Sequence, residues 1–280
     1  MKKITRRSFL AAAGLTAAAL ALTACGGSSS STASSAASSA AASSEVASSS
    51  AAAAELTTVE AGKLTMATNA AFPPYEMTTD AGDFEGIDIE TAQAIADKLG
   101  LELQIDDMDF DAALLSVQQG KADIVMAGVT VTDERKAVMD FSDSYATGIQ
   151  SIIVPEGSDI ASPDDLAGKK IGTQRGTTGY IYCSDDFGDE NVVAYDDGLT
   201  AVQALNNGQV DAVVIDNAPA KEFVAANPGL VILETSYAEE DYAIGLAKGS
   251  SLEDAINSAL EELKADGTLQ SIVDKYISAK

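Results

Sequence analysis

The chain has 280 residues with 43 acidic and 17 basic side chains, for a formal net charge of −26, and it contains no histidine. Histidine is the commonest general base and metal ligand in proteins, so the composition predicts no catalytic residues, no metal site and no cofactor. A strongly acidic surface repels a phosphate backbone, which argues against nucleic acid as a partner.

Residues 1–24 have the pattern of an export signal. Four basic residues open the segment: Lys2, Lys3, Arg6 and Arg7. The apolar stretch that follows, residues 11–22, would span about 18 Å as a helix, whereas the hydrocarbon core of a bilayer is about 30 Å thick. The segment is therefore predicted to be a signal peptide and not a membrane span. Residues 5–10, TRRSFL, also resemble a twin-arginine signal, which leaves two export routes open.

Residues 22–26, LTACG, resemble a bacterial lipobox. In proteins with that motif the cysteine sulfur carries a diacylglycerol, so the resemblance implies lipidation at Cys25. Several acyl chains together anchor a protein stably. Residues 25–56 are then the lipidated cysteine followed by a Gly, Ser and Ala tether, whose composition cannot bury enough apolar surface to fold. We expect a protein anchored on the extracytoplasmic face of the cell membrane.

The foldable part begins near residue 57 and alternates predicted strands with predicted helices. Its first half has predicted strands at 63–68, 101–105 and 123–127, and predicted helices at 90–99 and 111–119. The helical segments space their apolar residues at helical intervals, and Gly100 and Gly120 follow them as stop signals. This alternation favours a parallel sheet in an α/β lobe.

The same order then restarts. The second half has predicted strands at 170–173, 191–195 and 212–216, a helix after the glycine loop at 176–179, and another helix at 199–207. The clearest matching pair is GKADIV at 120–125 and GQVDAV at 208–213. We interpret the two halves as two similar lobes. Residues 252–263 and 269–276 are predicted to form two more amphipathic helices.

Residues 127–135, AGVTVTDER, with DFSD at 140–143, closely resemble the signature of bacterial polar amino-acid-binding proteins, the family-3 solute-binding proteins of ABC importers. Other segments match in the same order, at 72–76, 86–90, 174–179 and 257–267. The resemblance covers about residues 60–280. It implies an α/β fold of the periplasmic-binding-protein type II kind, with two similar lobes joined by a two-segment hinge. The implied lobes are residues 57–146 plus 243–280, and residues 150–239.

The resemblance also implies a function. Such a protein captures a free amino acid by hinge closure and delivers it to an ABC transporter permease, as a monomer and without catalysis. Two alternatives remain open at this point: a ligand-sensing subunit for a membrane receptor, and a dehydratase-like enzyme on the same fold. The enzyme is the weaker alternative, because the chain has no histidine and offers no convincing acid–base pair.

The family motifs supply candidates for both charges of a zwitterion, each of which needs a partner when buried. Arg135 is predicted to clamp the α-carboxylate, since a guanidinium matches a carboxylate bidentately. Gly128 and Thr130 would add a backbone group and a hydroxyl, and Thr178 would donate to the same carboxylate from a helix N-terminus. Asp216 is the candidate for the ammonium group, and it could also cap a helix.

The side-chain end of the pocket is expected to combine rings and amides. Phe72 and Phe110 would enclose the ligand between two aromatic rings, although either ring could instead belong to the core. Asn69 lies where relatives that bind basic amino acids are expected to have an acidic residue, and Gln174 is a second amide. Two neutral amides favour a neutral, glutamine-like ligand. Cys183 is expected to be a small buried apolar residue.

Overall fold

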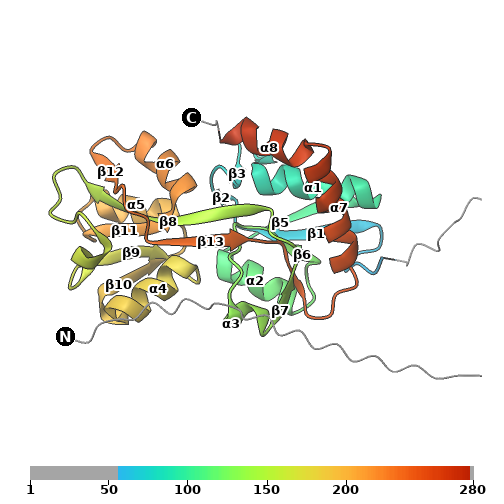
Figure 1. Ribbon diagram of the computed structural model, residues 1–280, viewed down its shortest axis with the longest axis horizontal. Helices are drawn as coiled ribbons and strands as arrows, with labels where there is room; N and C mark the ends of the chain where they lie inside the picture. The colour runs from blue at the N-terminus through green and yellow to red at the C-terminus, as the bar shows by residue number, and fades with distance from the viewer. Residues whose placement is uncertain (1–55, 278–280) are drawn as a thin grey trace, which may run out of the picture. The chain divides into compact units, whose positions relative to one another are not determined.

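A computed structural model describes residues 56–277 of the chain. The expectations for the signal peptide, for lipidation of Cys25 and for the tether lie outside the described residues. The described part has two lobes side by side, and strands β8 and β13 run between them (Figure 1). Within this part of the chain, no helix combines the length and the apolar character needed to cross a membrane.

The first lobe is built on a sheet with the strand order β5-β1-β6-β14-β7. Its strands are β1 (Lys63–Thr68), β5 (Glu102–Asp107), β6 (Ile124–Val125), β7 (Met139–Phe141) and β14 (Gly245–Ala247). Strand β1 is parallel to β5 and β6, as the alternation predicted, whereas β14 is antiparallel to its neighbours β6 and β7. A small antiparallel sheet accompanies it, made of β2 (Ala71–Phe72), β3 (Glu76–Thr78) and β4 (Phe84–Glu85).

Helices cover both faces of this sheet. The helices of the first lobe are α1 (Ile87–Leu99), α2 (Phe110–Gln118), α3 (Asp133–Lys136), α7 (Glu253–Ala265) and α8 (Thr268–Tyr276). Leu64 and Met66 of β1 pack in the core that α1, α7 and α8 share, while Ala67 packs in the core under α2. Helix α1 begins three residues before the predicted start at 90, and the extra residues bury Ile87 and Ile89.

The second lobe is built on a six-stranded sheet with the order β10-β9-β11-β8-β12, and β13 also pairs with β8. Its strands are β8 (Ala146–Pro155), β9 (Ile171–Gln174), β10 (Val192–Tyr195), β11 (Ala212–Asp216), β12 (Leu230–Ile232) and β13 (Ala238–Tyr242). Its helices are α4 (Thr178–Phe187), α5 (Gly198–Asn206) and α6 (Asn217–Ala226), with short 3₁₀ turns at Pro163–Leu166 and Asp189–Asn191. Strand β9 is parallel to β10 and β11, and β8 is antiparallel to β11, β12 and β13.

Strand β11 shows how the second sheet is buried on both faces. Val213 and Ile215 pack with residues of α5 and α6, whereas Ala212 and Val214 pack on the other face with Cys183 of α4. Successive side chains of a strand point to opposite faces, so a run of apolar residues is what a doubly covered strand requires. Cys183 is fully buried, as expected, and burial raises the pKa of its thiol to about 12.

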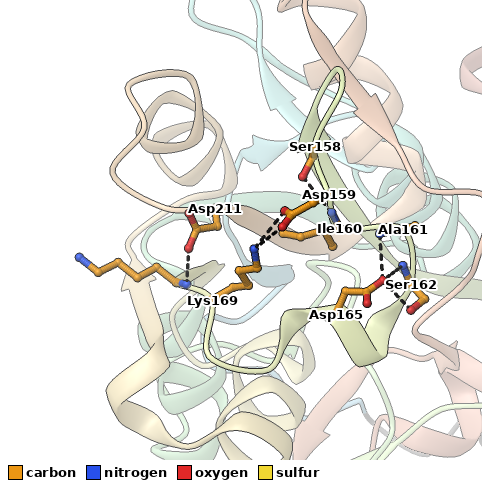
Figure 2. Close-up of polar contacts among 9 residues, drawn as sticks. Ser158, Asp159, Ile160, Ala161, Ser162, Asp165, Lys169 and Asp211 are labelled. Atoms are coloured by element: carbon orange, nitrogen blue, oxygen red, sulfur yellow. Dashed lines mark hydrogen bonds and ion pairs between the residues drawn. The ribbon is translucent and has the colours of Figure 1, made fainter.

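The matching GKADIV and GQVDAV segments do the same structural work in the two lobes. Asp123 accepts a hydrogen bond from the backbone N–H of Thr65 at 2.8 Å, at the start of β1. Asp211 accepts one from the N–H of Lys170 at 2.8 Å, directly before β9. Each aspartate therefore braces the first parallel strand of its lobe, which confirms the internal repeat. Figure 2 shows the Asp211 contact in the second lobe.

The loop beside Asp211 is held by two further polar contacts (Figure 2). Lys169 forms an ion pair with Asp159 at 3.0 Å. Ser162 and Asp165 form a capping box at the start of the first 3₁₀ turn. Both contacts lie at the surface, so each contributes little to stability on its own.

The two connections between the lobes are paired strands. Strands β8 and β13 pair from Ala238↔Gln150 to Tyr242↔Ala146, with Glu240 opposite Gly148. The lobe boundaries implied by the sequence put the crossings at 146–150 and 239–243, and no strands were predicted there. A Cβ atom on Gly148 would lie 2.4 Å from Cζ of Tyr242, so the ring fits only against a glycine. The lobe boundaries stated above stay a prediction.

We predict that Asp123→Ala lowers the free energy of unfolding by about 3 kcal/mol, because hydrogen bonds to a charged acceptor contribute about 1.5–3 kcal/mol each. The buried Asp123 carboxylate accepts from both Thr65 and the N–H of Val59, the latter at 2.7 Å. Urea denaturation measures the change. Asp80→Ala, at an exposed position, is the control and should change stability by less than about 0.5 kcal/mol. Equal midpoints for the two variants would show that the brace is not stabilising.

Candidate functional site

A small cavity lies where the two lobes meet, and residues of both lobes line it. All nine residues predicted to bind a ligand line it: Asn69, Phe72, Phe110, Gly128, Thr130, Arg135, Gln174, Thr178 and Asp216. They come from the C-terminal ends of β1, β6, β9 and β11, from β2 and α3, and from the starts of α2 and α4. The carboxyl ends of parallel strands are where α/β proteins place ligands, which explains why separate segments converge here. That these residues bind a ligand is still a prediction.

Arg135 lies at the junction of the lobes. It sits on α3, whose N-cap is Thr132, and its side chain is buried. Nη1 donates to the carbonyl oxygen of Thr130 at 2.8 Å in the first lobe, and Nη2 donates to that of Gly176 at 3.1 Å in the second. The guanidinium carbon is 5.4 Å from the centre of the Phe110 ring. Two of its five N–H groups are thus used by carbonyl oxygens, which leaves donors for an anion.

The charge of Arg135 is set by two opposing effects. Burial lowers the pKa of its guanidinium, and the nearby Glu240 carboxylate opposes that change. A guanidinium remains charged in proteins under these conditions, so the cavity wall carries a buried cation.

Asp216 ends β11 and caps α6. Its Oδ1 accepts from the N–H of Ala218 at 2.9 Å, and its Oδ2 accepts from the N–H of Ile149 at 2.8 Å. The capping alternative left open by the sequence is therefore confirmed. Burial raises the pKa of Asp216, and the two backbone donors oppose that rise. A carboxylate has more lone pairs than these two bonds use, so capping leaves Asp216 able to accept from a ligand.

Three other predicted residues show how the cavity wall is fixed. Thr178 is the first residue of α4, and its Oγ1 lies 3.4 Å from Oγ1 of Thr130 on the opposite lobe. The N–H of Gly128 donates to Asp88 at 2.9 Å. The backbone group that Gly128 can offer a ligand is therefore its carbonyl oxygen.

The two predicted aromatic residues are both buried at the cavity. Phe72 stacks on Tyr75 with ring centres 5.9 Å apart, and Tyr75 meets Tyr242 edge-on at 5.4 Å. Phe110 lies under the Arg135 guanidinium. Each ring thus has a neighbour within the protein as well as a face on the cavity, and the predicted enclosure of a ligand between them stays a prediction.

The two amides contact each other across the lobes. Nε2 of Gln174 donates to Oδ1 of Asn69 at 2.8 Å, and Nδ2 of Asn69 donates to the carbonyl oxygen of Met108 at 3.0 Å. Nε2 of Gln174 also donates to the carbonyl oxygen of Asp196 at 3.3 Å. These bonds occupy groups that the sequence interpretation assigned to a ligand amide.

Sequence reasoning missed five polar residues at or beside the cavity: Glu76, Gln150, Thr177, Glu240 and Tyr242. Glu76 ends the 72–76 motif, so its position in that motif could have indicated it. Its side chain is fully buried, and neither carboxyl oxygen accepts a hydrogen bond from an N–H or hydroxyl donor among residues 56–277; its polar neighbour is the Asp88 carboxyl. Burial, with Asp88 and Asp107 nearby, raises the pKa of Glu76 well above its usual range.

Asp88 lies behind Glu76 and completes a buried acidic pair. It accepts from Tyr145 at 2.7 Å as well as from the N–H of Gly128. Burial raises its pKa to about 6 despite these donors. Among residues 56–277, no group of three or more acidic, Cys or His side chains is arranged to hold a metal ion. The pair places two acidic groups next to the cavity, and burial favours the protonated form of each.

Comparison with known proteins gives a consistent result. A model of bacterial extracellular solute-binding proteins, family 3, matches residues 64–279. The L-cystine-binding protein TcyJ of Escherichia coli (strain K12) is 33% identical over 225 residues, which cover 79% of this chain and 84% of that protein. The arginine-binding extracellular protein ArtP of Bacillus subtilis (strain 168) is 32% identical, with 78% and 87% covered.

Solved structures give the same result for the fold. An ancestral arginine-binding protein bound to glutamine is 42% identical and superposes with a TM-score of 0.74, covering 78% of this chain and 99% of that one. The likeness confirms the periplasmic-binding-protein type II fold that the sequence motifs implied.

We predict that stability falls as pH rises from about 4 to about 6. Burial raises the pKa of Asp88 and of Glu76, so the folded protein holds protons that the unfolded chain releases. The stabilisation is fully present at a pH below the pKa of the carboxyl in the unfolded chain. It is lost as the pH rises through the pKa of the same carboxyl in the folded protein. For Asp88, a rise from 3.8 to about 6 corresponds to about 3 kcal/mol.

Urea denaturation at a series of pH values measures this slope. Glu76→Gln should flatten it, whereas Glu102→Gln, at an exposed position, should leave it unchanged. A wild-type stability that rises over this range, or a slope unaffected by Glu76→Gln, would contradict the assignment.

Proposed function

The chain belongs to the bacterial extracellular solute-binding proteins, family 3, and on that premise we propose that it captures a free polar amino acid and delivers it to an ABC transporter permease. The family is one of solute-binding proteins and not of enzymes, which removes the enzyme alternative. The observation that carries the proposal is the convergence of Arg135 and Asp216, a buried cation and a buried acid, on one cavity between two lobes.

The geometry supports a specific assignment of the ligand's charges. Arg135 would bind the α-carboxylate through the N–H groups that Thr130 and Gly176 do not use. Asp216 would accept from the α-ammonium with its remaining lone pairs. The hydroxyl of Thr178 stands at the start of α4, where a helix N-terminus favours an anion. A ligand that contacts both lobes stabilises the closed state through those differential contacts.

The family description is extracellular, and we propose that Cys25 carries the lipid that holds the protein at the membrane. The lipobox resemblance and the composition of residues 25–56 support this anchor. We propose that the protein acts as a monomer and that the permease is its protein partner, in keeping with the family. The acidic net charge argues against nucleic acid as a partner.

The side chain of the ligand has two candidates. Asn69 and Gln174 favour a neutral, glutamine-like ligand on sequence grounds, but their amides are bonded to each other. Glu76 favours a cationic side chain, because its buried carboxyl lines the cavity and no N–H or hydroxyl group among the described residues donates to it. A buried carboxylate without a partner is costly, and a guanidinium or ammonium would neutralise it. We therefore propose that a cationic amino acid is bound in preference to glutamine.

We expect Arg135→Ala to weaken amino-acid binding about thirtyfold or more, because removing one partner of a buried charge pair costs about 2–5 kcal/mol. Isothermal titration calorimetry with L-arginine and L-glutamine measures the loss. Arg175→Ala is the matched control, because Arg175 is exposed and forms an ion pair with the exposed Asp196 at 3.3 Å. Wild-type affinity in the Arg135 variant would show that the cavity assignment is wrong.

The two candidate side chains are separated by Glu76→Gln. With a cationic ligand, wild-type protein should bind L-arginine more tightly than L-glutamine, and the variant should lose about tenfold or more in arginine affinity while glutamine affinity changes less. Glu102→Gln should alter neither. Tighter binding of glutamine by the wild type, with both affinities unchanged in Glu76→Gln, would return the assignment to the neutral ligand.

A further inference from the structure

Glu240 is a buried acid that the ligand assignment above does not use. It lies on the inter-lobe strand β13, opposite Gly148 of β8, and the residue is 6% exposed. Its Oε2 accepts from Oγ1 of Thr130 at 3.1 Å and from Nε2 of Gln150 at 2.9 Å. Its Oε1 has no hydrogen-bond partner among residues 56–277. The carboxylate is therefore held by the first-lobe loop and by the strand that enters the second lobe.

The contact with Glu240 decides the direction of the Thr130 hydroxyl. A hydroxyl has one hydrogen to donate, and a carboxylate can only accept. The Thr130 hydrogen therefore points to Glu240, and Oγ1 of Thr130 is left as an acceptor. Oγ1 of Thr178, 3.4 Å away on the other lobe, can then only be the donor in that pair. Without Glu240, the Thr130 hydroxyl could turn either way.

The backbone around Thr130 keeps this geometry in place. Thr130 forms an isolated antiparallel bridge with Tyr242, two residues along the same strand as Glu240. The N–H of Val131 donates to the carbonyl oxygen of Asp241 at 3.0 Å, and the N–H of Ala243 donates to that of Val129 at 3.1 Å. Backbone hydrogen bonds on both sides of Thr130 thus hold its loop against the strand that carries Glu240.

We propose that Glu240 is a positioning residue for ligand binding. Because Glu240 accepts the hydrogen bond of the Thr130 hydroxyl, Oγ1 of Thr130 faces the cavity as an acceptor. The inference rests on the proposed function, since it assigns Glu240 to the same cavity. A hydroxyl that can only accept favours a ligand group that donates a hydrogen bond. A freely rotating hydroxyl discriminates less between donor and acceptor groups. The hydrogen bond to a charged group is also stronger than one to a neutral amide, so it holds Thr130 more firmly.

The first test is Glu240→Gln, which keeps the size and replaces the charged acceptor with an amide that also donates. Calorimetry with L-arginine and L-glutamine should show binding about tenfold weaker than in the wild type for whichever ligand binds. Glu239→Gln is the matched control, because Glu239 is the neighbouring acid on the same strand and is exposed. It should bind as the wild type does.

A double-mutant cycle separates action through Thr130 from general loosening of the strand. In a Thr130→Ser background, which keeps the hydroxyl, Glu240→Gln should still cost about tenfold. In a Thr130→Val background, which removes the hydroxyl, the cost should fall to about threefold or less. Where a variant binds too weakly for calorimetry, the rise in Tm at saturating ligand gives the same comparison.

The outcomes distinguish this inference from the function on which it rests. Wild-type protein that binds neither amino acid contradicts the proposed ligand class, and this inference with it. If wild-type protein binds and Glu240→Gln is silent, or costs the same in all three backgrounds, Glu240 is not acting through Thr130 and the proposed function stands. The inference is supported if Glu240→Gln weakens binding in the wild-type and Thr130→Ser backgrounds and this loss largely disappears in the Thr130→Val background.

Discussion

A guanidinium that is almost fully buried needs acceptors around it, and Arg135 finds its carbonyl acceptors in both lobes. The Thr130 carbonyl belongs to the first lobe and the Gly176 carbonyl to the second. Phe110 covers one face of the ion, and Glu240 supplies negative charge nearby. Desolvation of a charge is costly unless its partners are well placed. This single cation therefore constrains the relative position of the two lobes.

The remaining buried titratable groups beside the cavity are acids. Asp216 faces it from the second lobe, Glu76 and Asp88 lie in the first, and Glu240 lies on the strand between them. Asp216, Asp88 and Glu240 have hydrogen-bond donors within the protein, whereas Glu76 has none among the described residues. The site therefore has one acid whose needs the protein leaves unmet. This imbalance, more than the amides, separates the candidate ligands.

Much of this arrangement could be predicted from the sequence, for identifiable reasons. Arg135, Thr178 and Asp216 lie in short local motifs at strand or helix ends, where neighbouring residues decide the backbone and the fold brings the ends together. Glu76 lies in such a motif too, but its lack of partners depends on Asp88 and on packing far along the chain, which local pattern does not contain. The amides were identified as cavity residues, yet their mutual hydrogen bond depends on how the lobes meet.

The inter-lobe strands were the least predictable elements. Residues 238–242, AEEDY, hold three acidic residues, which are poor strand formers in isolation. They form a strand because β8 pairs with them and because Glu240 finds donors. Here tertiary contacts override local preference, and the same contacts make the segment part of the site.

The paired construction of β8 and β13 has a mechanical consequence. Two unpaired linkers would let the lobes tilt, twist and slide independently. Two strands paired at five residue positions resist shear and bend together as one β-ribbon. The Tyr242 ring seated on Gly148 stiffens the middle of that ribbon, since no side chain lies beneath it to yield. Relative motion of the lobes is thereby reduced from many directions to few. Closure around a ligand then fixes the lobes along few directions of relative motion. The conformational entropy of lobe motion that is lost on closure is correspondingly small.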